Sequence, residues 1–137
     1  MRTKILHDKL GKIPLVIAEV GQNHQGSLKI AKEYIREFSK CGADIIKFQA
    51  RNNKRLFSKE AYNKIYDSEN SFGKTYGQHR EKLELSFNDL RELKKECKKR
   101  NLLFMVTPFD ETSLKLVSKL NVDIIKIASF DLGNLPF

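Results

Sequence analysis

DIIKFQ at residues 44–49 and DIIKIA at residues 123–128 decide the fold, because each is a strand-length apolar run that follows a helical segment. Two further apolar runs, LVIAEV at 15–20 and LLFMV at 102–106, have the same character. Apolar side chains between these runs recur with a helical period, as they do over residues 28–38. This alternation predicts an α/β fold, with a parallel sheet of four strands and three helices packed outside it.

Capping residues mark the ends of the predicted helices. Gly42 is placed to end the first helix as a left-handed cap, Ser86 to begin the second and Asp110 to begin the third. Residues 51–80 hold no long period, and we expect a long excursion there with one short helix around Ala61–Tyr66. An excursion of this length is often functional.

Composition limits the classes of function. The 137 residues include 26 Lys and Arg against 17 Asp and Glu, a formal charge of +9, and 40% of them are hydrophobic. These values suit one domain with a core, and no run approaches the roughly 18 apolar residues of a membrane span. The basic residues are scattered without any nucleic-acid-binding motif, so we interpret the densest cluster, at 94–100, as a solvated helix face. Cys41 and Cys97 form no disulfide framework, and a reducing cytoplasm is the expected location.

Each predicted strand has one purely apolar face, while its other face ends in a polar group near the carboxyl end of the strand. These groups are Glu19, Lys47 with Gln49, Thr107 and Lys126. Strands of a parallel sheet are normally apolar on both faces, so the two lysines need a compensating negative charge. Either Glu19 pairs with a lysine inside the protein, or a ligand supplies the charge. Because parallel α/β proteins bind ligands at the carboxyl ends of their strands, we predict a small anion there, with Thr107 and Ser129 as donors.

Five ordered motifs resemble those of the sialic acid synthase (N-acetylneuraminate synthase) family. They are IAEVGQNHQG at 17–26, GADIIKFQ at 42–49, KLELS at 82–86, TPFD at 107–110 and KIAS at 126–129. The resemblance covers the chain from residue 13 onward. It implies a TIM-type barrel of strand-helix units, of which residues 1–137 would be the N-terminal half, without the metal-binding half and the C-terminal domain.

The resemblance also implies a reaction. The family is a transferase class that condenses phosphoenolpyruvate with an N-acetylated amino sugar, such as N-acetylmannosamine, to give a nine-carbon 2-keto-3-deoxy sugar acid. A divalent metal, manganese or magnesium, polarises the open-chain aldehyde of the sugar. We expect the metal in the full-length enzyme and none on this half alone, and we assign no metal ligand among its residues.

Motif by motif, the resemblance assigns roles to the residues of this chain. Lys47 and Lys126 would hold the phosphate and carboxylate of phosphoenolpyruvate, and Thr107 and Ser129 would add hydrogen bonds to it.

The remaining assignments concern the sugar and the loops. Glu19 would be catalytic beside the metal-bound water or the sugar aldehyde, and Gln49 and Asp131 would contact the sugar. Asp131 is shorter than the glutamate usual in the family, so the sugar specificity is expected to differ. His24 is expected to fix the loop after the first strand, and His79, which matches no motif, is expected at the surface.

The length of the chain leaves several interpretations open. A complete barrel of this type needs about 250 residues, and four strands alone leave open edges and an exposed apolar face. Either the chain is a fragment, or two copies pair, and in both cases we expect little or no activity from the chain alone.

Two alternative functions remain open. One is a non-catalytic, self-associating half-barrel that binds a small anion, and the other is a basic nucleic-acid-binding domain. For the main interpretation we expect phosphoenolpyruvate and an amino sugar as partners and a homo-oligomer, with no nucleic acid or membrane.

Overall fold

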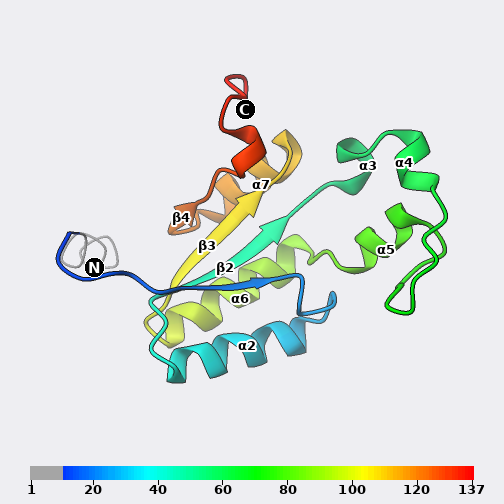
Figure 1. The fold of residues 1–137 in the computed structure, drawn as a ribbon. Coiled ribbons are helices and arrows are strands. Elements are labelled where there is room, and N and C mark those ends of the chain that lie inside the picture. Colours follow the sequence, from blue (N-terminus) through cyan, green and yellow to red (C-terminus); the bar gives the residue numbers. More distant parts are fainter. Residues whose placement is uncertain (1–10) are drawn as a thin grey trace.

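The computed structural model describes residues 11–137, which form one open, twisted parallel sheet with helices on one side (Figure 1). The strands are β1 (Ile17–Gly21), β2 (Ile45–Ala50), β3 (Leu103–Pro108) and β4 (Ile124–Ile125), and they lie in the sheet in sequence order. The predicted parallel sheet is thereby confirmed.

The fourth strand is shorter than the predicted run at 123–128. Only Ile124 and Ile125 pair with β3, and the backbone N–H of Lys126 adds one more bond, to the Val106 carbonyl at 3.1 Å. No described strand lies beyond β4, so its outer edge has no neighbour to extend it. The chain then turns into a 3₁₀ helix, η1 (Ser129–Asp131).

Three long helices cover one face of the sheet, as predicted: α2 (Leu28–Lys40), α6 (Phe87–Lys99) and α7 (Glu111–Leu120). The predicted caps are present. Gly42, with φ +82°, follows the last turn of α2. The Ser86 hydroxyl accepts from the Asp89 N–H at 3.2 Å to begin α6, and an Asp110 carboxylate oxygen accepts from the Ser113 N–H at 2.9 Å to begin α7.

The two faces of the sheet bury different amounts of apolar surface. The helix-covered face holds the main core, in which Ile46, Phe48, Phe104 and Val106 are fully buried against the helices. A smaller apolar cluster, centred on Ile45, Leu103 and Met105, lies on the opposite face. Both edges of the sheet expose apolar residues, among them Val16, Ile17, Ile125 and Ile127. Ile125 and Ile127 form the apolar face predicted for the fourth strand, and the short edge strand leaves them 39% and 45% exposed.

Residues 51–82 form a small helical layer beyond the carboxyl end of β2 (Figure 1). It comprises α3 (Asn53–Leu56), α4 (Lys59–Asn63) and α5 (Tyr76–Lys82), where the sequence predicted only one short helix. These helices are too short to show a period, and tertiary packing holds them. For example, a Cβ at Gly77 would overlap the ring of Tyr62, so only glycine lets α5 approach α4 this closely.

Two expectations from the sequence, on membrane spans and on disulfides, can be checked in the described residues. None of the helices within residues 11–137 is long and apolar enough to cross a bilayer. Both cysteines are free thiols, with Cys97 buried under the sheet and Cys41 exposed after α2.

Ser86→Ala is expected to lower the free energy of unfolding by about 1 kcal/mol, because it removes the N-cap of α6. The Ser86 hydroxyl also donates to the Asp89 carboxylate at 2.6 Å, which completes a reciprocal capping box. Urea unfolding followed by circular dichroism measures the loss. The exposed Ser118, inside α7, is the matched control, since Ser118→Ala is expected to change stability by less than about 0.5 kcal/mol. Equal losses in both variants would contradict the role of the cap.

Candidate functional site

The polar residues predicted on the four strands lie at one end of the sheet, on the face without helices. Strand register sets Glu19 opposite Lys47 and Gln49 opposite Thr107. Met105 pairs with Ile124, so Lys126, two residues further on, follows on the same face as Thr107. The structure therefore gathers these five side chains at the carboxyl ends of the strands, as the alternation pattern predicts.

The two lysines have different partners. The Lys47 ammonium forms an ion pair with Glu19, and the two side chains are 15% and 40% exposed. The internal ion pair left open by the sequence therefore exists for this lysine. The Lys126 ammonium instead donates to the backbone carbonyl of Ile127 at 3.0 Å. Within residues 11–137 no carboxylate forms an ion pair with Lys126, so its positive charge is not neutralised locally.

Two buried oxygen atoms among the predicted site residues have no hydrogen-bond partner among the described residues. They are the hydroxyl oxygen of Thr107, a residue only 3% exposed, and Oδ2 of Asp131, which is 9% exposed. The other carboxylate oxygen of Asp131 accepts from the Asn134 side chain at 3.2 Å. A buried polar atom without a partner costs about 1–3 kcal/mol, and binding a ligand removes such a cost. Ser129, by contrast, begins η1 at the exposed surface.

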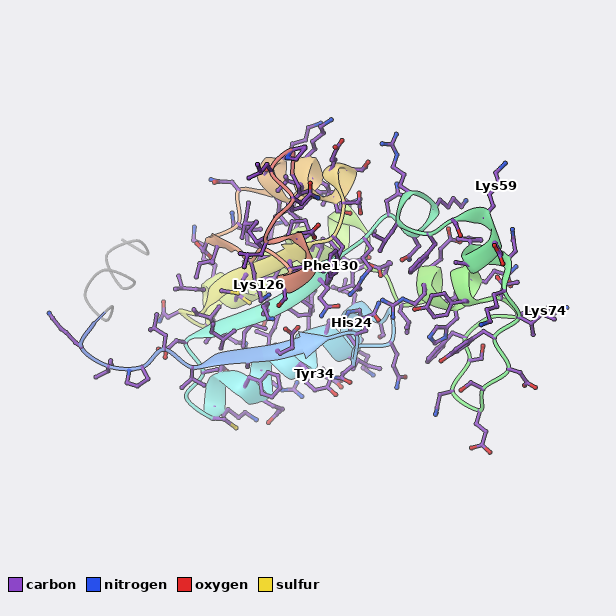
Figure 2. The ribbon with its side chains drawn as sticks, turned by 45° about the horizontal axis from the view of Figure 1, so that its top comes forward. His24, Tyr34, Lys59, Lys74, Lys126 and Phe130 are labelled. Atoms are coloured by element: carbon purple, nitrogen blue, oxygen red, sulfur yellow. The ribbon has the colours of Figure 1, made fainter. Side chains whose placement is uncertain are left out.

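An aromatic contact holds η1 beside the end of β3. The Phe130 ring lies 5.7 Å from the ring of Phe109, centroid to centroid. Figure 2 shows Lys126 and Phe130 near each other, away from Tyr34 on α2. This contact places η1, which contains Asp131, beside the residue that follows β3. Phe130 itself remains 68% exposed.

An ion pair that the sequence did not predict lies beside Gln49. Arg51 contacts Glu84 with 3.3 Å between Nη1 and Oε1, and the two side chains are only 8% and 15% exposed. Burial lowers the pKa of Arg51 against the opposing attraction of Glu84, and burial likewise raises the pKa of Glu84 against the attraction of Arg51. The available signal was that Glu84 falls within KLELS and Arg51 follows Gln49 by two residues. Neither position shows that the two meet.

Two histidines are buried and serve the loops around the site. His24 is 2% exposed, and its Nδ1 accepts from the Gly26 N–H at 3.0 Å, so it fixes the loop after β1 as expected. The expectation that His79 lies at the surface is wrong, since it is 8% exposed. Its Nδ1 accepts from the Phe72 N–H at 3.2 Å, among the rings of Tyr66, Phe72 and Tyr76.

Stability is expected to fall as the pH drops below 6.5. Burial lowers the pKa of His24 and of His79 below the ordinary value of 6.5, so both rings stay neutral in the folded chain where the unfolded chain binds protons. Unfolding then takes up protons, and the free energy of unfolding declines as the pH falls. Urea midpoints at pH 7.5 and 5.5 measure this, with His24→Asn and His79→Asn expected to flatten the slope. A midpoint that rises toward pH 5.5 would contradict both assignments.

Across residues 11–137, no three His, Cys, Asp or Glu side chains converge in a way that could hold a metal ion.

Comparisons with known proteins agree with this geometry. The NeuB family profile matches residues 34–137. The N-acetylneuraminate-9-phosphate synthase of Drosophila melanogaster is 42% identical over 96% of this chain and 36% of its own length, and that of Homo sapiens is 40% identical over 89% and 34%. The N-acetylneuraminic acid synthetase of Leptospira borgpetersenii, solved with citrate, superposes with a TM-score of 0.71 at 32% identity, over 93% of this chain and 43% of that protein. The chain thus spans about a third of the length of the relatives named by sequence, and it belongs to the NeuB family.

Proposed function

We propose that this chain is the phosphoenolpyruvate-binding half of a sialic acid synthase-like enzyme. The enzyme would join phosphoenolpyruvate to an N-acetylated amino sugar of the N-acetylmannosamine type and release a nine-carbon 2-keto-3-deoxy sugar acid. The observation that carries the proposal is the buried, unpartnered hydroxyl of Thr107, which lies between Gln49 and Lys126 at the carboxyl ends of the strands.

The site suits a small, doubly acidic metabolite. Lys126 offers a charge that no described carboxylate neutralises, and Thr107 offers a donor that no described residue uses. Lys47 supplies a second charge, shared with Glu19, and the exposed Ser129 can add a hydrogen bond from η1. Phosphoenolpyruvate carries a phosphate and a carboxylate, so two ammonium groups and two hydroxyls are matched to its charge.

The sugar would bind beside Glu19, Gln49 and Asp131. In the proposed reaction the methylene carbon of phosphoenolpyruvate attacks the sugar aldehyde and forms the new C–C bond, while the aldehyde oxygen gains a proton. Water adds at the enol carbon, and phosphate leaves by cleavage of the C–O bond. Glu19, which pairs with Lys47, would hold a proton at the reacting oxygen, and the unpartnered Oδ2 of Asp131 would accept from a sugar hydroxyl. The divalent metal, manganese or magnesium, would be held by residues outside the described chain.

We propose that turnover needs the rest of a barrel, and the open sheet supports this expectation. Ile17 and Ile127, at opposite edges of the sheet, are 46% and 45% exposed, where further strands of a barrel would cover them. The same edges favour the second candidate, in which two copies pair as a self-associating half-barrel that binds an anion without catalysis.

A mixing experiment tests the proposal. The chain is combined with the C-terminal remainder of a family synthase, Mn²⁺, phosphoenolpyruvate and N-acetylmannosamine or its 6-phosphate. We expect the 2-keto-3-deoxy acid and free phosphate only in the mixture. Steady product from the chain alone would refute the incomplete barrel. A chain that dimerises in sedimentation, binds phosphoenolpyruvate and never supports turnover would favour the second candidate.

A further inference from the structure

We propose that Arg51 and Glu84 form a positioning pair that holds the Gln49 side chain with its NH₂ group toward the substrate. This inference deepens the proposed function and rests on it. Neither Arg51 nor Glu84 is proposed to contact phosphoenolpyruvate or the sugar. Together they determine which atom of Gln49 contacts the substrate.

The hydrogen bonds of Arg51 fix the Gln49 carboxamide directly. Arg51 Nη2 donates to Gln49 Oε1, so the carbonyl oxygen of the amide is occupied. The NH₂ group is then the part of Gln49 left to face a ligand. This Nε2 lies on the Gly21 side of Gln49, because a Cβ built on Gly21 would be 3.8 Å from it and 3.5 Å from Glu19 Oε1. A hydrogen-bond donor and a carboxylate acceptor thus flank the same glycine at the end of β1.

Glu84 in turn holds Arg51 at two points. Its Oε1 lies 3.3 Å from Arg51 Nη1, and its Oε2 accepts from the Arg51 backbone N–H at 3.2 Å. The Gln22 side chain donates to the same Glu84 Oε1 at 3.1 Å, which ties in the loop after β1. The Phe109 ring follows the end of β3, and its centroid lies 4.0 Å from Arg51 Cζ. The ring thus packs against the guanidinium group of Arg51. Arg51 therefore has little freedom to release Gln49.

Stability alone does not account for such a pair. Burying two charges costs solvation energy that their attraction often fails to recover, so a buried ion pair is weak evidence for stability. A planar guanidinium with fixed donors is, however, well suited to orient a neighbouring carbonyl. The orientation makes Gln49 a donor to a substrate oxygen, such as the acetamido carbonyl or a hydroxyl of the sugar, beside the acceptor Glu19.

Nuclear magnetic resonance of the ¹⁵N-labelled chain tests the pair without any need for activity. The Gln49 side-chain NH₂ signals, assigned by their loss in Gln49→Glu, are expected to be shifted away from free-amide positions, because Arg51 holds the carboxamide in one orientation. Arg51→Lys, which keeps the charge but loses the planar fork, and Glu84→Gln are each expected to collapse them toward the averaged positions of a free amide. The Lys54–Glu81 pair, 3.7 Å apart with side chains 74% and 41% exposed, is the matched control. Lys54→Met with Glu81→Gln should leave the Gln49 signals unchanged.

The outcomes separate this inference from the proposed function. Unchanged Gln49 signals in Arg51→Lys and Glu84→Gln would overturn the positioning pair. If single variants lose their fold, Arg51→Met with Glu84→Met replaces both charges together, and persistence of the wild-type Gln49 signals in that folded variant would overturn it equally. Titration of the wild-type chain with N-acetylmannosamine in the presence of phosphoenolpyruvate forms the second arm. Collapse in the variants without any sugar-dependent shift in the wild type supports the pair and counts against the proposed substrate.

Discussion

Gly26→Ala is expected to lower the free energy of unfolding by about 2–5 kcal/mol, from about 1–2 kcal/mol for a left-handed alanine and about 1–3 kcal/mol for overpacking. Gly26 has φ +73°, and a Cβ there would overlap the Lys82 carbonyl oxygen and lie 3.2 Å from the Lys82 carbonyl carbon. These are backbone atoms, so they cannot move aside as a flexible side chain would. The substitution would separate the loop after β1 from the end of α5.

Gly42→Ala separates the cost of a left-handed alanine from the cost of the steric overlap. Gly42 has φ +82°, but a Cβ there would meet nothing within 4 Å. Only the left-handed backbone opposes the change, so a loss of about 1–2 kcal/mol is expected. Urea unfolding of both variants gives the comparison. If Gly26→Ala and Gly42→Ala lost equal stability, the close approach of Gly26 to Lys82 would not constrain the fold.

Lys126→Ala is expected to weaken phosphoenolpyruvate binding by about 10- to 150-fold. A hydrogen bond to a charged group contributes about 1.5–3 kcal/mol, and each 1.4 kcal/mol is about a tenfold change in Kd. Lys47→Ala is expected to cost more, because it also leaves the Glu19 carboxylate unpaired beside the incoming anion. Isothermal titration calorimetry measures both.

Lys98→Ala is the matched control for the loss of one positive charge. Lys98 is exposed on α6, which covers the opposite face of the sheet. We expect its affinity for phosphoenolpyruvate to stay within about twofold of wild type, because an exposed charge beyond a Debye length of about 10 Å is largely screened. Equal losses for Lys98→Ala and Lys126→Ala would point to general attraction by the charge of +9 instead of a site.

Hydrophobic period and capping residues allowed most of the fold to be predicted from the sequence. Side-chain alternation correctly placed Lys47 and Gln49 on the face opposite the helices, because a strand buried on both sides leaves few positions for a charge. The extent of β4 was wrong, because strand length depends on a neighbour that the local sequence does not report. Helix α5 was missed, because seven residues are held by packing and not by a period.

The candidate site was predicted in part. The strand residues follow from parity along each strand, whereas Arg51 and Glu84 are 33 positions apart and meet only because the excursion returns the chain to the end of β2. Asp131 came from the resemblance alone. The contact between Phe130 and Phe109 holds η1, which contains Asp131, beside the residue after β3, and no local pattern encodes this contact.

A crystal structure of the chain soaked with phosphoenolpyruvate tests the proposed site most directly. We expect density for one molecule at the carboxyl ends of β2 and β3, near the start of η1. The Thr107 hydroxyl and the Lys126 ammonium are expected within hydrogen-bond distance of its acidic groups. Density only elsewhere on the surface, or an empty strand end at a phosphoenolpyruvate concentration that saturates the calorimetric signal, would contradict it.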